Sequence, residues 1–262
     1  MSDMELFAQL NYGKVHVRLK GSTLPPFEFG PLRAVGFTPE LNELSVADPR
    51  TRSNSELTGV SRPAGGTLQG ELLALPPETL ATLLAGTRNE VAAGTVTDEA
   101  VVVMVGRTTM TKRLPLKVTK LTSEDGAEEY DAGVDFVKTP GGFRVLAGGA
   151  LATAIAAETA DTDGNKSLTC KVSYSTPKAS LVQAFMKSRR YYEVFIETMN
   201  EAGDDMGRRV TFRRARIGLS GDLPLINRDD IAAIGVTFTL SEDPDYAFDG
   251  SGFFEWEEEL PA

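Results

Sequence analysis

Residues 190–242 read RYYEVFIETMNEAGDDMGRRVTFRRARIGLSGDLPLINRDDIAAIGVTFTLSE, and this stretch decides the fold. Its last part, IGVTFTLS (234–241), alternates apolar residues with small or polar ones, which is typical of a strand with one buried and one wetter face. Residues 192–198 alternate in the same way, and the Gly, Asp and Asn residues that tight turns need follow at 200–207. With the segment between them, the stretch predicts three antiparallel strands.

The middle strand, residues 209–217, changes the phase of its alternation near Arg213 and Arg214. This indicates a bulge or a strand that is polar on both faces. The strand also carries the main concentration of arginines. Three interpretations stay open: salt bridges to a neighbouring acidic surface, such as another subunit's tail, a solvated face, or a nucleic-acid contact. We favour inter-subunit salt bridges, made by Arg209, Arg213, Arg214 and Arg216.

The composition is that of an ordinary globular protein, with 262 residues, 41% hydrophobic and 24% charged. No apolar run reaches the roughly 18 residues that indicate a membrane span. The first ten residues have no basic region, so we expect no signal peptide. The single cysteine, Cys170, excludes an internal disulfide, suits a reducing cytoplasm, and lies in an alternating run that predicts a half-buried strand.

The net charge of −10 is unevenly distributed. Residues 243–262 contain seven acidic residues and no basic one, which leaves about −3 for the rest of the chain. A chain of this sign is not expected to hold nucleic acid by neutralising phosphates. It could instead form a surface along which DNA slides.

Three further strands and a long connection are predicted before residue 75. Residues 14–20 alternate, and their His16 has no second His or Cys nearby, so we expect a solvent-facing strand residue and no metal ligand. Residues 32–47 are extended, and 67–73 form their partner strand. The connection 48–63 is far longer than a usual hairpin loop. It is either flexible or ordered by contact with another subunit.

One short helix is predicted at residues 76–85. Two prolines begin it, Glu78 favours its first turn, and Gly86 is placed to end it. The helix should cover one face of the sheet through an apolar stripe of Leu80, Leu83 and Leu84.

Residues 96–174 read as short strands at regular spacing, the pattern of a small sandwich. We predict an inserted outer β subdomain there, with a discontinuous core of residues 1–95 and 175–262. Within the insert, residues 150–157 are either a helical turn or a slack loop.

Motifs for chemistry are missing from the sequence. It has no second His or Cys for a nucleophile–base pair, no phosphate-binding glycine loop and no G-x-S-x-G. Residues 161–165 resemble half of a calcium loop without the distal Glu. A glycosidase using two carboxylates across a cleft is left open by the sequence. We expect no enzyme and no catalytic, cofactor-binding or metal-binding residues.

Three segments together resemble the major tail tube proteins of long-tailed bacteriophages. They are residues 190–245, GTLQGELLALPPETLATLLAG (66–86), and EEYDAGVDFVKTPGGFRVLAGGALA (128–152) followed by LTCKVSYS (168–175). No single motif is specific to this family, but the order of the three segments is. The C-terminal acidic aromatic segment departs from the resemblance.

The resemblance implies a mainly β, sandwich- or barrel-like tail tube fold. It implies hexameric rings that stack into a hollow tube, whose lumen viral DNA crosses without specific binding. It implies location in the virion, no cofactor, no membrane, and contacts with tape measure, terminator and distal tail proteins. The long loop would contact the next ring through Asp48, Arg50, Arg52, Asn54, Glu56 and Arg62. Lumen-facing residues would be Thr67, Gln69, Glu71, Thr237 and Thr239.

Two rival functions remain. One is another phage tail β protein, such as a tail terminator or a host- or glycan-recognition module. The other is a β-sandwich hydrolase.

Overall fold

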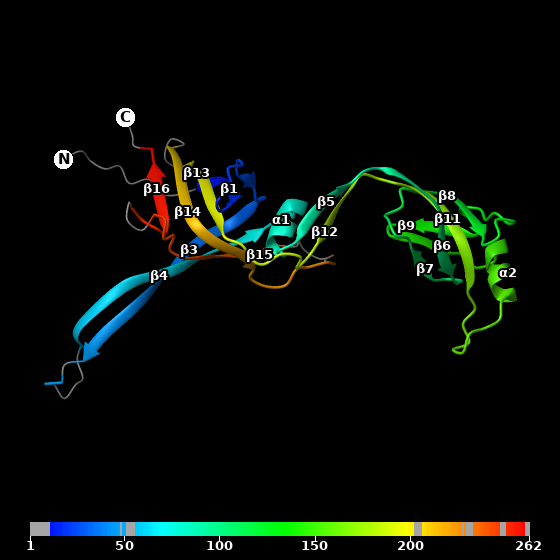
Figure 1. The fold of residues 1–262 in the computed structure, drawn as a ribbon, viewed down its shortest axis with the longest axis horizontal. Helices are drawn as coiled ribbons and strands as arrows, with labels where there is room; N and C mark the ends of the chain where they lie inside the picture. Colours follow the sequence, from blue (N-terminus) through cyan, green and yellow to red (C-terminus); the bar gives the residue numbers. More distant parts are fainter. Residues whose placement is uncertain are drawn as a thin grey trace. The chain divides into compact units, whose positions relative to one another are not determined.

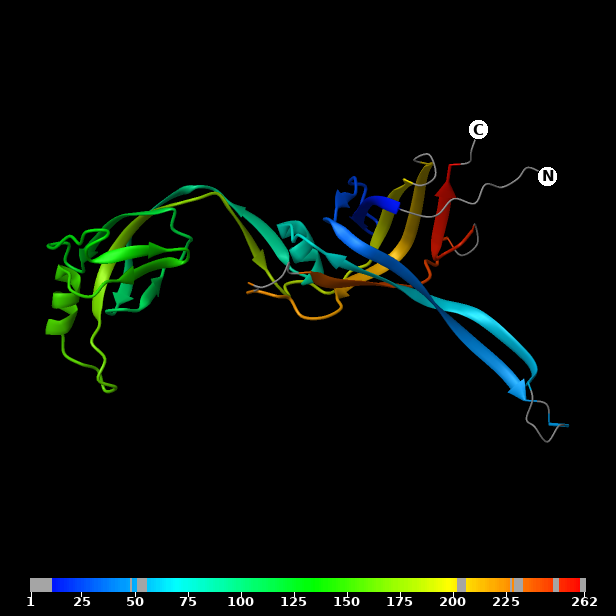
Figure 2. The ribbon, with the colours of Figure 1, turned by 180° about the vertical axis from the view of Figure 1, so that it is seen from behind.

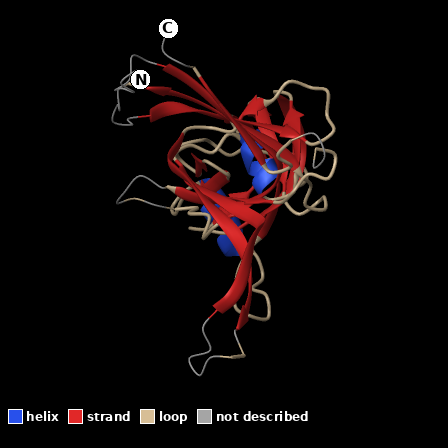
Figure 3. Cartoon of the chain, turned by 90° about the vertical axis from the view of Figure 1, so that its left-hand side faces the viewer, coloured by secondary structure: helices blue, strands red, loops and turns tan. Residues whose placement is uncertain are grey.

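The computed structural model describes residues 11–47, 49–50, 56–201, 206–226, 228, 233–246 and 250–259. It is mainly β, with several antiparallel sheets and two short helices (Figure 3). The predicted mainly β class is therefore confirmed. The second helix, α2, settles the alternative left open for residues 150–157 in favour of a helix.

The chain forms two compact units, Met1–Arg88 with Val182–Ala262, and Asn89–Leu181. The expected boundaries lay closer together, at 95/96 and 174/175. The difference arises because the chain enters and leaves the second unit through two paired strands, β5 (Thr87–Val91) and β12 (Ala179–Gln183).

The first unit contains one sheet in the order β2-β1-β13-β14-β15-β4-β3, with β16 also paired to β14 (Figure 1). Its strands are β1 (Asn11–Leu19), β2 (Phe27–Glu28), β3 (Leu32–Ala47), β4 (Glu56–Leu72), β13 (Tyr192–Asn200), β14 (Met206–Leu219), β15 (Ile234–Leu240) and β16 (Phe254–Glu258).

The three strands predicted from residues 190–242 are confirmed as β13, β14 and β15, each antiparallel to the next. Val236 and Phe238 are fully buried, as the alternation predicted. The bulge is also confirmed. Tyr192 pairs with Ala215 and Val194 with Phe212, so one residue of β13 lies opposite two residues of β14.

The bulge divides one edge of β14 between two partners. Ala215–Leu219 pairs with β15, whereas Arg208–Phe212 pairs with β16. Both partners run antiparallel to β14, so β15 and β16 lie end to end along the same edge. On the β16 side, Phe212 of β14 packs against Phe37 of β3 and Phe254 of β16, and the three ring centroids lie 5.4–5.6 Å apart.

Helix α1 (Pro77–Leu83) packs differently from the prediction. Leu83 is buried, but its companions are Thr79 and Ala81, while Leu80 and Leu84 are only partly buried. Thr79 fits because its hydroxyl donates to the Phe29 carbonyl at 2.5 Å, which satisfies a polar group in the core. The residue in the left-handed conformation after the helix is Ala85, with φ 47°, and not Gly86.

The second unit has a core of its own, built from two three-stranded sheets and α2. Their orders are β6-β11-β8 and β7-β10-β9. Cys170 is fully buried in β11, deeper than the half-buried position expected, and burial raises the pKa of its thiol to about 11. The elements are β6 (Gly94–Val103), β7 (Thr108–Met110), β8 (Lys117–Ser123), β9 (Phe136–Thr139), β10 (Gly142–Val145), α2 (Ala150–Ala157) and β11 (Leu168–Thr176).

Helix α2 has no capping side chain at its own N-cap, Gly149. The cap comes from another element instead. The buried carboxylate of Asp135 accepts hydrogen bonds from the backbone N–H groups of Leu151 and Asp131, both at 2.9 Å. A carboxylate at this end also suits the helix dipole. This long-range cap explains why the local sequence left residues 150–157 undecided.

Candidate functional site

The five residues expected to face a lumen lie together on the sheet face away from the core. Thr239 pairs with Thr67 and Thr237 with Gln69, while Glu71 lies opposite Gly235. The intervening residues of both strands are buried in the core. The sequence thus placed residues from two distant segments on one small polar surface.

Ion pairs connect neighbouring strands on the first unit's sheet. Arg33 pairs with Glu71 at 2.6 Å, and Arg18 pairs with Glu193 at 2.6 Å. His16 lies 3.6 Å from Glu197, with about a fifth of its side chain exposed. Positive and negative groups are interspersed on these strands.

Strands β3 and β4 continue as a two-stranded ribbon beyond the rest of the sheet. Strand β15 pairs with β4 only from Gly66 to Leu72, whereas β3 and β4 stay paired as far as Ala47 and Glu56 (Figures 1 and 2). The expected loop at 48–63 is therefore wrong in its second half. Residues 56–63 are strand because β3 supplies backbone partners along their whole length.

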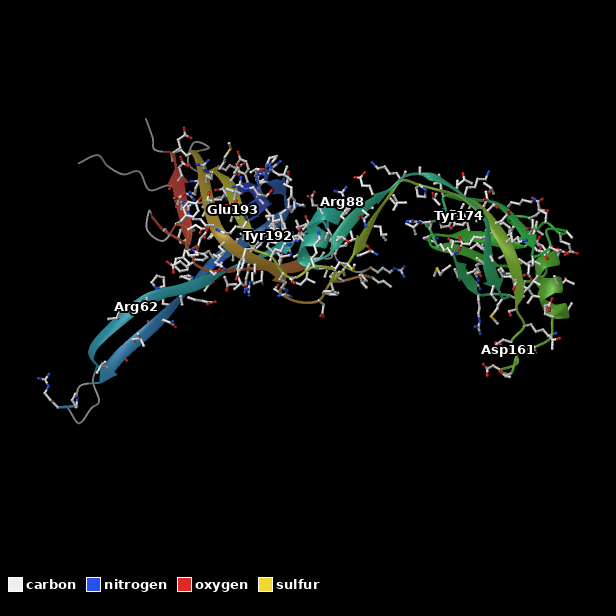
Figure 4. The ribbon with its side chains drawn as sticks, viewed as in Figure 1. Arg62, Arg88, Asp161, Tyr174, Tyr192 and Glu193 are labelled. Carbon is white, nitrogen blue, oxygen red and sulfur yellow. The ribbon has the colours of Figure 1, made fainter. Side chains whose placement is uncertain are left out.

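Two of the predicted inter-ring residues lie on a strand of the ribbon and not in a loop. Arg62 lies on β4 (Figure 4) and pairs with Asn42. Glu56 begins the strand, while Arg50 is an exposed turn residue. The others, Asp48, Arg52 and Asn54, lie outside the described residues.

One face of the ribbon carries exposed apolar side chains toward its tip, beyond the polar pair Asn42 and Arg62. Leu44 pairs with Val60, and Val46 follows on the same face; these side chains are 63%, 50% and 57% exposed. The opposite face carries Glu43, paired with Ser61, and the exposed Leu41, paired with Pro63. A two-stranded hairpin alone is marginally stable in water. An exposed apolar face on such a hairpin therefore indicates a partner surface.

The acidic aromatic C-terminal segment has a place in the sheet. As β16 it pairs with β14, and its glutamates form ion pairs with the β14 arginines. Arg209 and Arg213, for which we expected partners in another subunit, are thus paired within the chain. The three pairs are Arg208–Glu258, Arg209–Glu257 and Arg213–Glu255.

The glutamates of these pairs are exposed, and exposed ion pairs contribute only about 0–1 kcal/mol each. Strand β16 is therefore also held by packing: Phe254 contacts the phenyl rings of Phe37 and Phe212, and Arg208 lies 4.6 Å from the ring centre of Trp256. The alternation in FEWEE was the signal for this strand. Its arginine partners lie more than 40 residues earlier, so the pairing could not be assigned from local pattern.

A buried ion pair holds the connection between β15 and β16. Asp243 is fully buried and pairs with Lys20, which also approaches Asp245 at 3.3 Å. Burial by itself lowers the pKa of Lys20, but the two aspartates outweigh it and the pKa is raised. A charge this buried is stable only with such a partner.

The other two predicted arginines, Arg214 and Arg216, face the ring of Tyr191, with their guanidinium carbons 3.9 and 4.7 Å from its centre. Neither forms an ion pair with a described residue.

A groove of about 790 Å³ opens between β3 and the strands β1, β13, β14 and β16. Its walls include Phe37, Val210 and Phe254, with Arg208 and Trp256 at one side. Within the described part of the chain, no group of His, Cys, Asp or Glu residues is arranged to hold a metal. None of the described helices is long and apolar enough to span a membrane.

Comparison with known proteins identifies a family whose function is unknown. Residues 9–257 match the family model described as "Protein of unknown function UCP028589". The match covers nearly the whole chain, so the chain belongs to this family. No curated protein matches it.

Proposed function

We propose that this protein is the structural subunit of a phage tail tube, and that its copies form stacked hexameric rings around a channel for viral DNA. The observation that carries the proposal is the β3–β4 ribbon, which exposes Leu44, Val46 and Val60 without a covering element among the described residues. A heterologous contact of this kind, repeated between identical copies, generates an open filament.

The sheet edges supply the contacts within a ring. The outer edge of β3 has no strand partner among the described residues, and β2 covers β1 only at His16 and Val17. Pairing of one copy's β1 edge with another copy's β3 edge would satisfy these backbone groups. The sandwich- or barrel-like core is then completed by neighbouring copies.

The polar face with Thr67, Gln69, Thr237 and Thr239 lines the channel in this proposal. Hydroxyl and amide groups keep the wall wet, and the overall charge of −10 disfavours phosphate binding, so DNA passes without being held. The protein acts in the virion without catalysis or cofactor. Its other partners are the tape measure, terminator and distal tail proteins.

Negative-stain microscopy of concentrated protein tests the proposal. We expect hollow rods for the wild type and none for Leu44→Asp, which places a charge on the apolar ribbon face. Ser61→Asp is the matched control, because it adds the same charge to the opposite face of the same ribbon, and rods should persist. Single closed rings would favour a tail terminator, and monomers that bind glycans a recognition module; either result rejects the tube.

A further inference from the structure

A second charged surface of the first unit is unused by the proposed tube contacts. We name it the arginine cluster: Arg189, Arg214 and Arg216, of which the last two lie beside the ring of Tyr191. Arg216 donates a hydrogen bond to the Tyr191 hydroxyl at 2.6 Å, and Arg214 donates to the Glu242 carbonyl at 3.2 Å. The guanidinium of Arg189 lies over Gly218, two residues beyond Arg216 on the same strand face.

The bulge in β14 creates this cluster. Phe212 and Ala215 both face the core, so the two residues between them, Arg213 and Arg214, both lie on the other side. Arg213 is then neutralised by Glu255, and Arg214 is left beside Arg216.

The charge of the cluster is uncompensated within the part of the chain that the structure describes. None of its three arginines forms an ion pair there, whereas the neighbouring Arg208, Arg209 and Arg213 all do. Three neighbouring guanidinium groups, two of them beside an aromatic ring, are well suited to bind carboxylates through paired N–H donors.

The second unit carries a surface of opposite charge. The turn that follows β8 reads SEDGAEEYD (123–131) and places five exposed carboxylates within eight residues. Among described residues they form one ion pair, a long one of 3.7 Å between Lys120 and Glu129. We name this the acidic turn: Glu124, Asp125, Glu128, Glu129 and Asp131.

We propose that the arginine cluster of one copy binds the acidic turn of a second copy. The inference rests on the proposed self-assembly and adds a contact between the first unit of one subunit and the second unit of another. Nucleic acid is the less suitable partner for the cluster, because the rest of the chain is acidic and repels phosphate. The acidic turn of a second copy offers a small group of carboxylates to the cluster, whereas nucleic acid brings a long chain of phosphates.

Charge exchange tests the contact. The double variant Arg214→Glu/Arg216→Glu and the double variant Glu128→Lys/Glu129→Lys should each weaken self-association at least tenfold in analytical ultracentrifugation. An equimolar mixture should restore it, because the glutamates introduced in the first variant then meet the lysines introduced in the second. The unchanged arginines of the second variant likewise meet the unchanged carboxylates of the first. Lys117→Glu/Lys138→Glu, with the same charge change as the arginine variant on exposed positions of the second unit, should behave like the wild type. Circular dichroism verifies that all variants fold.

The outcomes separate this inference from the tube. Wild-type assembly by the arginine variant overturns the contact and leaves the tube standing. Failure of the mixture to restore association overturns the acidic turn as the partner. Loss of duplex DNA retention with unchanged self-association assigns the cluster to nucleic acid and also overturns the contact. If the wild type forms no rods but the two variants associate only with each other, the contact stands and the tube is rejected.

Discussion

Arg213 and Arg214 are adjacent in the sequence and end in different surroundings. Arg213 pairs with Glu255 and lies 3.7 Å from the centre of the Tyr246 ring, whereas Arg214 lies over Tyr191 without a carboxylate among the described residues. The slip in hydrophobic phase predicted the bulge correctly, because Phe212 and Ala215 must both reach the core. The slip could not predict which partner each arginine contacts, because those partners come from distant segments.

At Ala85 the backbone adopts a conformation that favours glycine. Its φ of 47° is left-handed and strained for a residue with a Cβ. We expect Ala85→Gly to raise the free energy of unfolding by about 0.5–1 kcal/mol, measured by urea denaturation. Ala81→Gly, inside helix α1, should lower it by about 1 kcal/mol. Destabilisation by both would show that Ala85 is not strained.

Among the elements, β15 and β4 differ in how far the sequence predicted them. Strand β15 has one face fully in the core, so its alternation was visible. Residues 56–63 of β4 have no buried side chains among those described, so the sequence shows no apolar alternation there. Their polar, turn-like composition therefore suggested a loop. Pairing with β3 along the whole length decides the structure there, and such register is not a local property of sequence.

Acid should weaken the attachment of strand β16. Hydrogen bonds from Arg208 and then Trp256 lower the pKa of Glu258 below its ordinary 4.5. A lowered pKa means that this carboxylate stabilises the fold above pH 4.5, and that the contribution is lost as pH falls through the folded pKa. Trp256 is the single tryptophan, so its fluorescence reports the strand directly.

We therefore expect an acid transition in Trp256 fluorescence that is weakened in Glu258→Gln, whose amide does not titrate. Glu124→Gln, in the second unit, is the control and should titrate like the wild type. Identical acid transitions in the wild type and Glu258→Gln would show that this ion pair does not hold β16.

For the whole molecule, the inserted unit is joined to the rest through the paired strands β5 and β12. The sequence predicted an insert with other boundaries than those of the second unit. The two connecting strands pair with each other, and neither segment by itself shows that pairing.

Replacing residues 92–178 by a short turn containing Asn-Gly should leave the first unit folded, because its core contains no residue of the insert. Circular dichroism should show one cooperative unfolding transition. The variant should also self-associate less than the wild type, because it lacks the acidic turn. A variant that cannot fold would show that the first unit needs the insert. Undiminished self-association would show that the acidic turn does not take part in assembly.

The end-to-end arrangement of β15 and β16 has a consequence for biosynthesis. Strand β16 leaves the ribosome after the other seven strands of its sheet, so a nascent chain can build most of that sheet while Phe212 still lacks its final cover. Strand β16 thus completes the surface over Phe212 after the rest of its sheet, and a growing chain leaves this ring uncovered until residues 254–258 have been translated.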